Sequence, residues 1–192
     1  MSIPVMLVDA RPDRRDVLGP TLSGEGFDIV ACVSPDEDLL AAVRLFSPDV
    51  ILIDIDSPSR DTLESLRTAQ AHQPRPMVMF TLDDASESIR RAVEAGVTAY
   101  IVDGLEGRRV RPIVDAAMAS FRQFRALEQE LAETRGKLAD RKLIERAKGI
   151  IMEQQRLSES DAFQAMRKLA MRKNKKLVEI ADSVISAAEL LR

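Results

Sequence analysis

Residues 48–58 read PDVILIDIDSP, and this segment gives the clearest indication of the fold class. Its apolar part, residues 50–54, is short, rich in Ile, and does not alternate between apolar and polar side chains. This pattern is typical of a parallel strand that is buried on both faces. Runs of the same kind recur at even spacing along the first half of the chain, at residues 3–8, 27–33, 77–81 and 99–102. The first half therefore predicts five buried strands.

The segments between these runs carry apolar residues at helical spacing, most clearly at residues 39–46 and 89–93. Ser34 and Glu37 resemble a capping box, which predicts that the second helix begins at Pro35. Strands that alternate with helices indicate right-handed crossovers and a sheet covered on both faces. We therefore expect an α/β fold with a doubly wound, five-stranded parallel sheet in residues 1–118.

Polar residues stand at the ends of four predicted strands: Asp9, Asp54, Thr81 and Asp103. Doubly wound sheets bind their ligands at the carboxyl ends of the strands. Asp9 and Asp54, from different strands, could hold a Mg²⁺ ion, and the Thr81 hydroxyl could bind a phosphoryl oxygen. The alternative is that Asp and Thr only begin loops here, as they often do. Several such residues at neighbouring strand ends favour a site.

These strand ends resemble the receiver domains of response regulators. The matching segments are VMLVDARP at 5–12, PDVILIDIDSP at 48–58, VMFTLDD at 78–84 and AGVTAYIV at 95–102. The resemblance implies a flavodoxin-like fold in which Asp54 is the phosphoacceptor, made competent by Mg²⁺. It also implies that Thr81 and Tyr100 form the switch pair that reports the modified state.

Two positions depart from the receiver pattern. Ala10 follows Asp9 where receivers carry a second acid, and Asp103 stands at the strand end where they carry lysine. The loss of a carboxylate weakens a Mg²⁺ site, and an anion in place of a cation repels a phosphoryl group. Asp13 could supply the missing carboxylate. We predict that Asp54 is phosphorylated poorly or not at all.

Residues 119–139 predict a coiled-coil connector within a long helix that begins near residue 107. The seam residues, spaced by three and four, are Phe124, Leu127, Leu131, Thr134 and Leu138. The alternative is a helix whose apolar stripe packs on its own domain, but the flanking charged residues leave no other apolar face. We expect a homodimer through this seam, with Gly136 as a flexible joint before the last module.

Residues 140–192 show no strand pattern and predict a small all-α domain of three helices, the second of which begins at Ser158 with Asp161. Residues 1–118 hold 12 Arg, no Lys and 20 acidic residues, whereas residues 119–192 hold 16 Lys and Arg against 11 acidic residues. Net positive charge is typical of a unit that binds a phosphate backbone. Only one aromatic residue follows Phe124, so an aromatic platform for stacking bases is excluded.

The last module closely resembles the ANTAR domain, the RNA-binding module of transcription antitermination regulators. The matching pieces lie at 146–152 (RAKGIIM), 157–163, 166–170 and 174–181. The resemblance implies binding to hairpins with exposed loop bases in nascent leader mRNA, with two hairpins for each dimer. By matching position, the RNA-binding residues are Lys142, Arg146, Lys148, Gly149, Arg167, Asn174 and Lys175.

The segment AYIVDGL at 99–105, ahead of this module, is similar to the nitrate- and nitrite-responsive antiterminators. In that subgroup a separate ligand-sensing protein sequesters the regulator, so the expected partner is such a protein, or a histidine kinase. The alternative is a phosphorylation-dependent, DNA-binding response regulator, and a third hypothesis is a protein-only adaptor. An enzyme is not expected, because the single histidine, His72, lies in a polar loop and no nucleophile–base pair is visible.

Composition predicts a cytoplasmic protein. The single cysteine, Cys32, cannot form an internal disulfide, which suits a reducing compartment. No apolar run approaches the length of a membrane span, and the first residues lack the basic and apolar regions of a signal peptide.

Overall fold

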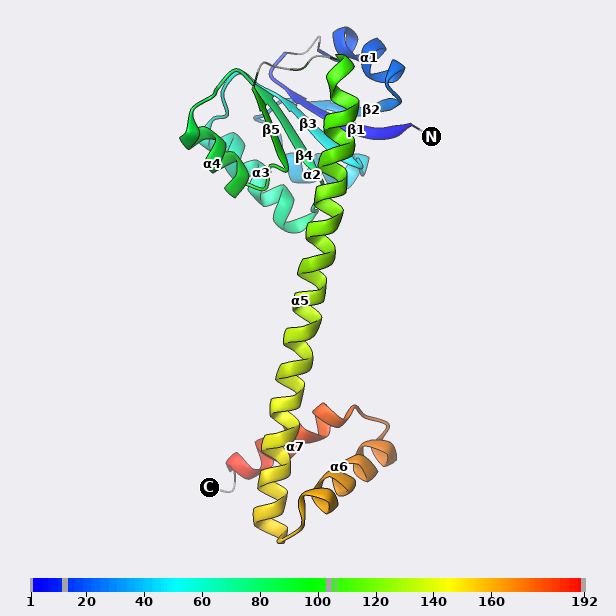
Figure 1. Cartoon of the computed structure of the whole chain (residues 1–192), viewed down its shortest axis with the longest axis vertical. Helices are drawn as coiled ribbons and strands as arrows, with labels where there is room; N and C mark the ends of the chain where they lie inside the picture. The colour runs from blue at the N-terminus through cyan, green and yellow to red at the C-terminus, as the bar shows by residue number, and fades with distance from the viewer. Residues whose placement is uncertain (1, 12–13, 103–104, 106, 191–192) are drawn as a thin grey trace. The chain divides into compact units, whose positions relative to one another are not determined.

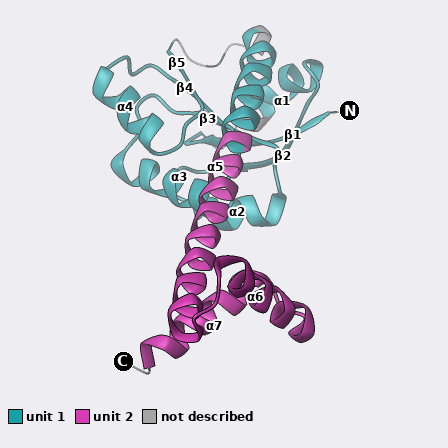
Figure 2. Ribbon diagram, turned by 60° about the horizontal axis from the view of Figure 1, so that its bottom comes forward, with its two compact units in different colours: residues 1–125 teal, residues 126–192 magenta. Residues whose placement is uncertain are grey.

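The computed structural model describes residues 2–11, 14–102, 105 and 107–190. It divides into two compact units, residues 1–125 and 126–192 (Figure 2).

Unit 1 is built on a five-stranded parallel sheet with the order β2-β1-β3-β4-β5 (Figure 1). The strands are β1 (Ile3–Asp9), β2 (Phe27–Val33), β3 (Val50–Asp54), β4 (Met77–Thr81) and β5 (Ala99–Val102). Each neighbouring pair of strands is parallel. The predicted fold class and the five predicted strands are confirmed.

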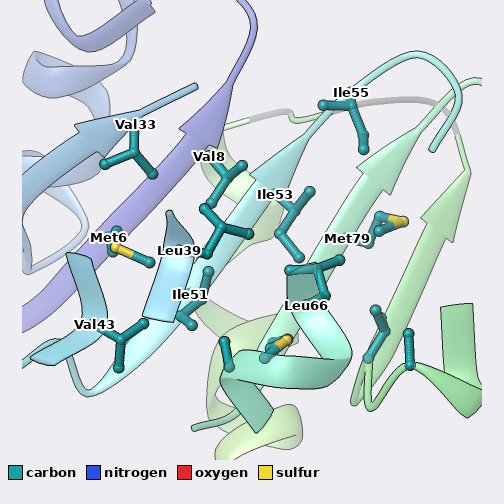
Figure 3. Close-up of a cluster of buried hydrophobic side chains, with 14 of the residues drawn as sticks. Met6, Val8, Val33, Leu39, Val43, Ile51, Ile53, Ile55, Leu66 and Met79 are labelled. Atoms are coloured by element: carbon teal, nitrogen blue, oxygen red, sulfur yellow. The ribbon is translucent and has the colours of Figure 1, made fainter. Parts of the chain in front are cut away.

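Helices cover both faces of this sheet. One face carries α1 (Arg14–Gly24) and the start of α5 (Gly107–Gln155), and the other carries α2 (Leu39–Phe46), α3 (Arg60–His72) and α4 (Ser86–Glu94). Successive residues of β1 point to opposite faces. Met6 and Val8 join the core under α2 and α3 (Figure 3), whereas Leu7 joins the core under α1 and α5. Because both faces are buried, the strands do not alternate between apolar and polar residues.

The second helix begins later than its sequence predicts. Ser34 and Glu37 do interact, since the Ser34 backbone N–H donates to Glu37 Oε1 at 2.7 Å, but they close a turn that precedes the helix. Helix α2 begins at Leu39, and Asp38 is its N-cap, accepting a hydrogen bond from the Ala41 backbone N–H at 2.9 Å. The predicted start at Pro35 is therefore wrong, because Asp38, four residues after Ser34, is the residue that caps the helix.

Helix α5 is 49 residues long and runs from unit 1 into unit 2. It continues through Gly136 without a break in the helix, and the flexible joint expected at this residue stays a prediction. One glycine costs a helix only about 1 kcal/mol relative to alanine, and good helix formers surround it. Within the described residues, no helix is both long and apolar enough to cross a membrane, and α5 is rich in charged side chains.

Unit 2 packs the last turns of α5 against α6 (Glu159–Lys173) and α7 (Leu177–Leu190). Its core consists of alanine, isoleucine and methionine side chains from these helices: Ala147, Ile151, Ala162, Met166, Ala170, Ile180, Ala181 and Ile185. Helix α6 is capped by Ser158, which accepts a hydrogen bond from the Asp161 backbone N–H at 3.2 Å, as the capping box predicts. The predicted small three-helix arrangement is confirmed.

Candidate functional site

The carboxyl edge of the sheet brings two predicted site residues together. Asp9 ends β1 and Asp54 ends β3, and they are direct partners in the register of the two strands. Both are buried, with 4% and 7% of their surface exposed. Two buried carboxylates at one place require a cation or hydrogen-bond donors to offset their charge.

Arg11 supplies that cation. Its Nε donates to Asp9 Oδ1 at 3.0 Å, and its Nη2 donates to both Asp9 Oδ2 and Asp54 Oδ2 at 3.0 Å. The Arg11 backbone N–H also donates to Asp9 Oδ1, at 2.8 Å. The hydrogen bond to Asp9 and the nearby carboxylates raise the pKa of Arg11 above its ordinary value. The Arg11 side chain, with 51% of its surface exposed, therefore forms a charge-assisted bridge between the ends of the two strands.

This bridge conflicts with the expected Mg²⁺ site at Asp9 and Asp54. Magnesium requires near-octahedral oxygen coordination, with carboxylate lone pairs free to face the ion. Here one guanidinium nitrogen already lies between the two carboxylates. No group of three acidic, His or Cys side chains placed to hold a metal occurs in the described part of the chain. With the Arg11 guanidinium between the two carboxylates, the residues present do not fit the ion. Asp13, which could complete the set, and Asp103 both lie outside the described residues.

The predicted switch pair lies at the end of β4 and in β5. The buried Thr81 hydroxyl donates to the Asp56 backbone carbonyl at 2.7 Å and accepts from the Asp83 backbone N–H at 3.1 Å. The Tyr100 hydroxyl donates to the Asp83 carbonyl at 2.8 Å, and burial raises the pKa of this phenol. Thr81 and Tyr100 therefore hold the same short segment, the loop that begins α4.

The connector part of α5 carries an apolar stripe that nothing covers in a single chain. Four of the five predicted seam residues are large apolar side chains with about half of their surface exposed: Phe124 at 59%, Leu127 at 64%, Leu131 at 49% and Leu138 at 56%. All residues from 122 to 142 are exposed. The alternative, in which the stripe packs on its own domain, does not agree with this exposure.

The predicted RNA-binding residues fall into three places in unit 2. Lys142, Arg146 and Gly149 are exposed on α5, Arg167 is exposed on α6, and Asn174 and Lys175 form the exposed turn before α7. Arg146 and Gly149 line one groove of about 330 Å³ between α5 and α7, together with Glu153 and Glu189. Arg146 Nη2 lies 2.9 Å from Glu189 Oε1 across this groove. Open space surrounds Gly149, so a ligand could approach the backbone closely.

Asn174 also has a structural role at the end of α6. It is the C-cap of α6, in the left-handed conformation with φ of 50°, and its backbone N–H bonds back to the last turn of the helix. Asparagine adopts this conformation more readily than most residues.

Lys148 differs from the other predicted RNA-binding residues because it is buried, with 7% of its surface exposed. Its Nζ lies 2.8 Å from Glu145 Oε2 and 2.7 Å from Glu159 Oε1. Hydrogen bonds to Glu145 and Glu159 raise the pKa of Lys148, and the same contact lowers the pKa of Glu159. This geometry joins α5 to α6, and Lys148 does not lie on the exposed basic surface.

Sequence reasoning misses Arg11 and the two glutamates around Lys148. The only signal for Arg11 is an arginine two residues after the strand end at Asp9, where a turn could fold it back. The signal for Glu145 is its spacing of three residues from Lys148 on one helix.

Two protein families match the chain. Residues 5–114 match the response regulator receiver domain, and residues 132–185 match the ANTAR domain. The transcriptional regulatory protein PdtaR of Mycobacterium tuberculosis strain H37Rv is 29% identical over 168 residues, which cover 88% of this chain and 82% of that protein. The nitrate regulatory protein of Klebsiella oxytoca is 34% identical over 90 residues, covering 47% of this chain and 23% of that protein.

Solved structures with a similar fold include receiver domains. A CheY-like receiver domain protein from Methanospirillum hungatei JF-1 superposes with a TM-score of 0.55 at 21% identity, covering 64% of this chain and 98% of that chain. The chemotaxis regulator CheY4 of Vibrio cholerae gives 0.52 at 19% identity, covering 61% and 99%. At such identities the likeness shows the fold alone.

The two predicted resemblances are therefore confirmed in their predicted order along the chain, and the nitrate regulatory protein agrees with the predicted subgroup. These are regulatory families rather than families of enzymes. The chain belongs to the response regulators that carry a receiver domain, and its C-terminal unit is an ANTAR domain.

Proposed function

We propose that this protein is a cytoplasmic transcription antitermination regulator that binds hairpins in nascent leader mRNA through its ANTAR domain. The observation that carries the proposal is the match of residues 132–185 to the ANTAR domain. The exposed basic residues of unit 2 support it, because cations on a small helical unit attract a phosphate backbone. These residues are Lys142, Arg146, Arg167 and Lys175, with Gly149 and Asn174 beside them. Lys148 is not part of this surface, because its ammonium group pairs with Glu145 and Glu159 of the same unit.

The protein binds RNA as a dimer. A second copy of the chain covers the apolar seam of α5, which is exposed along its length in a single chain. Burying a large apolar side chain contributes about 1.5–3 kcal/mol, so a few seam residues are enough to favour pairing. Two ANTAR domains held together can engage two hairpins at once, which raises the overall affinity.

A partner protein gates this activity, rather than robust phosphorylation of Asp54. The receiver unit contains no lysine, so the cation that usually pairs with the phosphoryl group is absent from its sequence. The Asp54 carboxylate is already engaged by Arg11. The partner is a ligand-sensing regulatory protein; a histidine kinase is the alternative, and it would require Asp54 to react.

RNA selection by the full-length protein tests the proposal. A library of stem-loops with a randomised loop is bound, recovered and sequenced, and the best stem-loop is titrated in competition with duplex DNA of the same stem. Enrichment of particular loops, and affinity that exceeds that for DNA, is the expected result. Binding that ignores the loop contradicts the proposal, and tighter binding to duplex DNA favours the DNA-binding alternative.

Substitutions test which residues of the protein bind RNA. Arg146→Ala and Lys175→Ala each remove one phosphate contact and are expected to weaken RNA binding and reduce its salt dependence. Arg67→Ala is the matched control, since it removes an exposed arginine from unit 1. Equal effects of all three substitutions would point to general charge rather than to the ANTAR surface.

A further inference from the structure

The receiver pocket contains a cation that belongs to the chain. The Arg11 guanidinium bridges the last residues of two adjacent strands, Asp9 of β1 and Asp54 of β3. It makes two side-chain hydrogen bonds to Asp9 and one to Asp54, all at 3.0 Å. The planar, forked guanidinium matches paired carboxylate oxygens better than an ammonium group does.

The local chain holds Arg11 in this position. Its backbone N–H donates to Asp9 Oδ1 at 2.8 Å, which folds the first turn after β1 back over the strand end. Three N–H donors of Arg11 therefore converge on the Asp9 carboxylate. From there the guanidinium has only to reach the adjacent strand, β3, to contact Asp54. The neighbouring residue, Ala10, adds no competing charge.

The electrostatics of the pocket depend on this contact. Asp9 and Asp54 are both more than nine-tenths buried, and two such anions side by side repel each other strongly. A buried charge is tolerated when a partner of opposite sign also satisfies its hydrogen bonds. The Asp56 carboxylate adds to the attraction for a cation here. Arg11 offsets this repulsion without any ligand from solution.

A divalent metal and Arg11 would compete for the same oxygens. The Arg11 Nη2 contacts Asp9 Oδ2 and Asp54 Oδ2, the two oxygens that converge on one point between the strands. A Mg²⁺ ion bound to these oxygens would sit at about 2 Å from each of them, within the space of that nitrogen. The two cations therefore exclude each other.

We propose that Arg11 is the resident cation of this pocket, that it replaces the divalent metal, and that removing its side chain creates a divalent-metal site at Asp9 and Asp54. Arg11 keeps Asp54 engaged and the receiver unit stable in the absence of metal. The inference goes beyond the proposed function and does not depend on RNA binding, because it concerns the pocket of unit 1 alone.

Titration of the full-length protein with Mn²⁺ and Mg²⁺ tests this inference. Metal binding is measured by calorimetry and by the electron paramagnetic resonance signal of free Mn²⁺ for the wild type, Arg11→Ala and the control Arg67→Ala. We expect Arg11→Ala to bind one Mn²⁺ at least tenfold more tightly than the wild type, and Arg67→Ala to behave as the wild type. Metal affinity that is equal in the wild type and Arg11→Ala overturns the proposal, as does the absence of metal binding to Arg11→Ala.

Thermal unfolding provides a second readout. In a chelator, Arg11→Ala should unfold at a lower temperature than the wild type, and millimolar Mg²⁺ should recover most of that loss while leaving the wild type unchanged. Should Arg11→Ala fail to fold without metal, Arg11→Gln keeps a polar head of similar reach and is tested in the same way. A loss of stability that Mg²⁺ does not recover in either variant, or stabilisation of the wild type by Mg²⁺, contradicts the proposal.

Discussion

Lys148 Nζ lies 2.7 Å from Glu159 Oε1 and joins the end of α5 to the first turn of α6. Glu145, one turn earlier on α5, contacts the same ammonium group at 2.8 Å. The lysine itself is buried, whereas both glutamates are partly exposed. The resulting ion-pair cluster fixes two helices of the ANTAR domain to each other.

Substitution of Lys148 is expected to destabilise the ANTAR domain. Lys148→Ala removes the ammonium group and leaves Glu145 and Glu159 facing each other without a cation. The unfolding temperature of this unit should fall by a few degrees, measured by circular dichroism on the full chain. Lys142→Ala, on the exposed surface of the same helix, is the control. Unchanged stability combined with a loss of RNA affinity would instead return Lys148 to the RNA-binding residues that the sequence pattern predicts.

The same cluster predicts a pH dependence. Its hydrogen bond to Lys148 lowers the pKa of Glu159 in the folded protein. The stability that Glu159 contributes is therefore present above the unfolded-state pKa and is lost as the pH falls through the lower folded-state pKa. The difference in stability between the wild type and Glu159→Gln should be constant near neutral pH and shrink below about pH 4. A difference that grows on acidification would contradict this assignment.

The Arg146–Glu189 pair predicts a gain in RNA affinity. Both side chains are 60% exposed, so the pair contributes little to stability, but a phosphate that binds Nη2 of Arg146 must compete with the Glu189 carboxylate. Glu189→Gln should tighten binding of the selected stem-loop about two- to fivefold. Glu153→Gln removes one negative charge from the same groove and leaves the pair in place. Equal gains in both variants would show that only the net charge of the groove matters.

Most of the fold could be predicted because its signals are local. Short apolar runs without alternation mark strands that are buried on both faces, and all five are present in the sheet. The Ser158 cap was also readable from sequence. The start of α2 was not, because Ser34 and Asp38 both have the chemistry of a cap, and only the packing of Leu39 and Val43 decides between them.

The site was less predictable, because its decisive contacts join residues with long side chains. Asp9 and Asp54 follow from their places at strand ends. The bridge by Arg11 depends on a turn whose direction the sequence does not reveal. Lys148 and Arg146 lie two residues apart on one helix and look alike in sequence, yet the Lys148 side chain is buried by its contacts and the Arg146 side chain is exposed. Helical phase separates them, and it requires the positions of α6 and α7.

The occupied pocket predicts that Asp54 does not accept phosphate readily. Full-length protein incubated with acetyl phosphate and Mg²⁺ should show no stable adduct on Asp54 by mass spectrometry, because Arg11 holds the carboxylate and the receiver unit has no lysine to pair with the phosphoryl group. The triple variant Ala10→Asp, Arg11→Ala, Asp103→Lys restores the receiver pattern and should gain labelling, with Asp54→Asn in that background as the control. Stable, stoichiometric labelling of the wild type would contradict this prediction.

The exposed seam of α5 predicts that the chain dimerises. Leu131 lies in the middle of the seam, and Ala132 follows it on the flank of the same helix. Leu131→Glu places a charge where the partner helix must pack, so the variant should be monomeric at micromolar concentration, whereas Ala132→Glu introduces the same residue outside the seam and should leave the dimer intact. Sedimentation equilibrium distinguishes the two masses, since one chain is 21.3 kDa.

The dimer also predicts how RNA binding changes. RNA with one hairpin should bind Leu131→Glu as it binds the wild type. RNA with two hairpins should lose its additional affinity, because that gain requires two ANTAR domains to be held together. A wild type that remains monomeric at all concentrations would remove the seam as the dimer interface and leave the exposure of Phe124, Leu127 and Leu138 to be explained by a different partner.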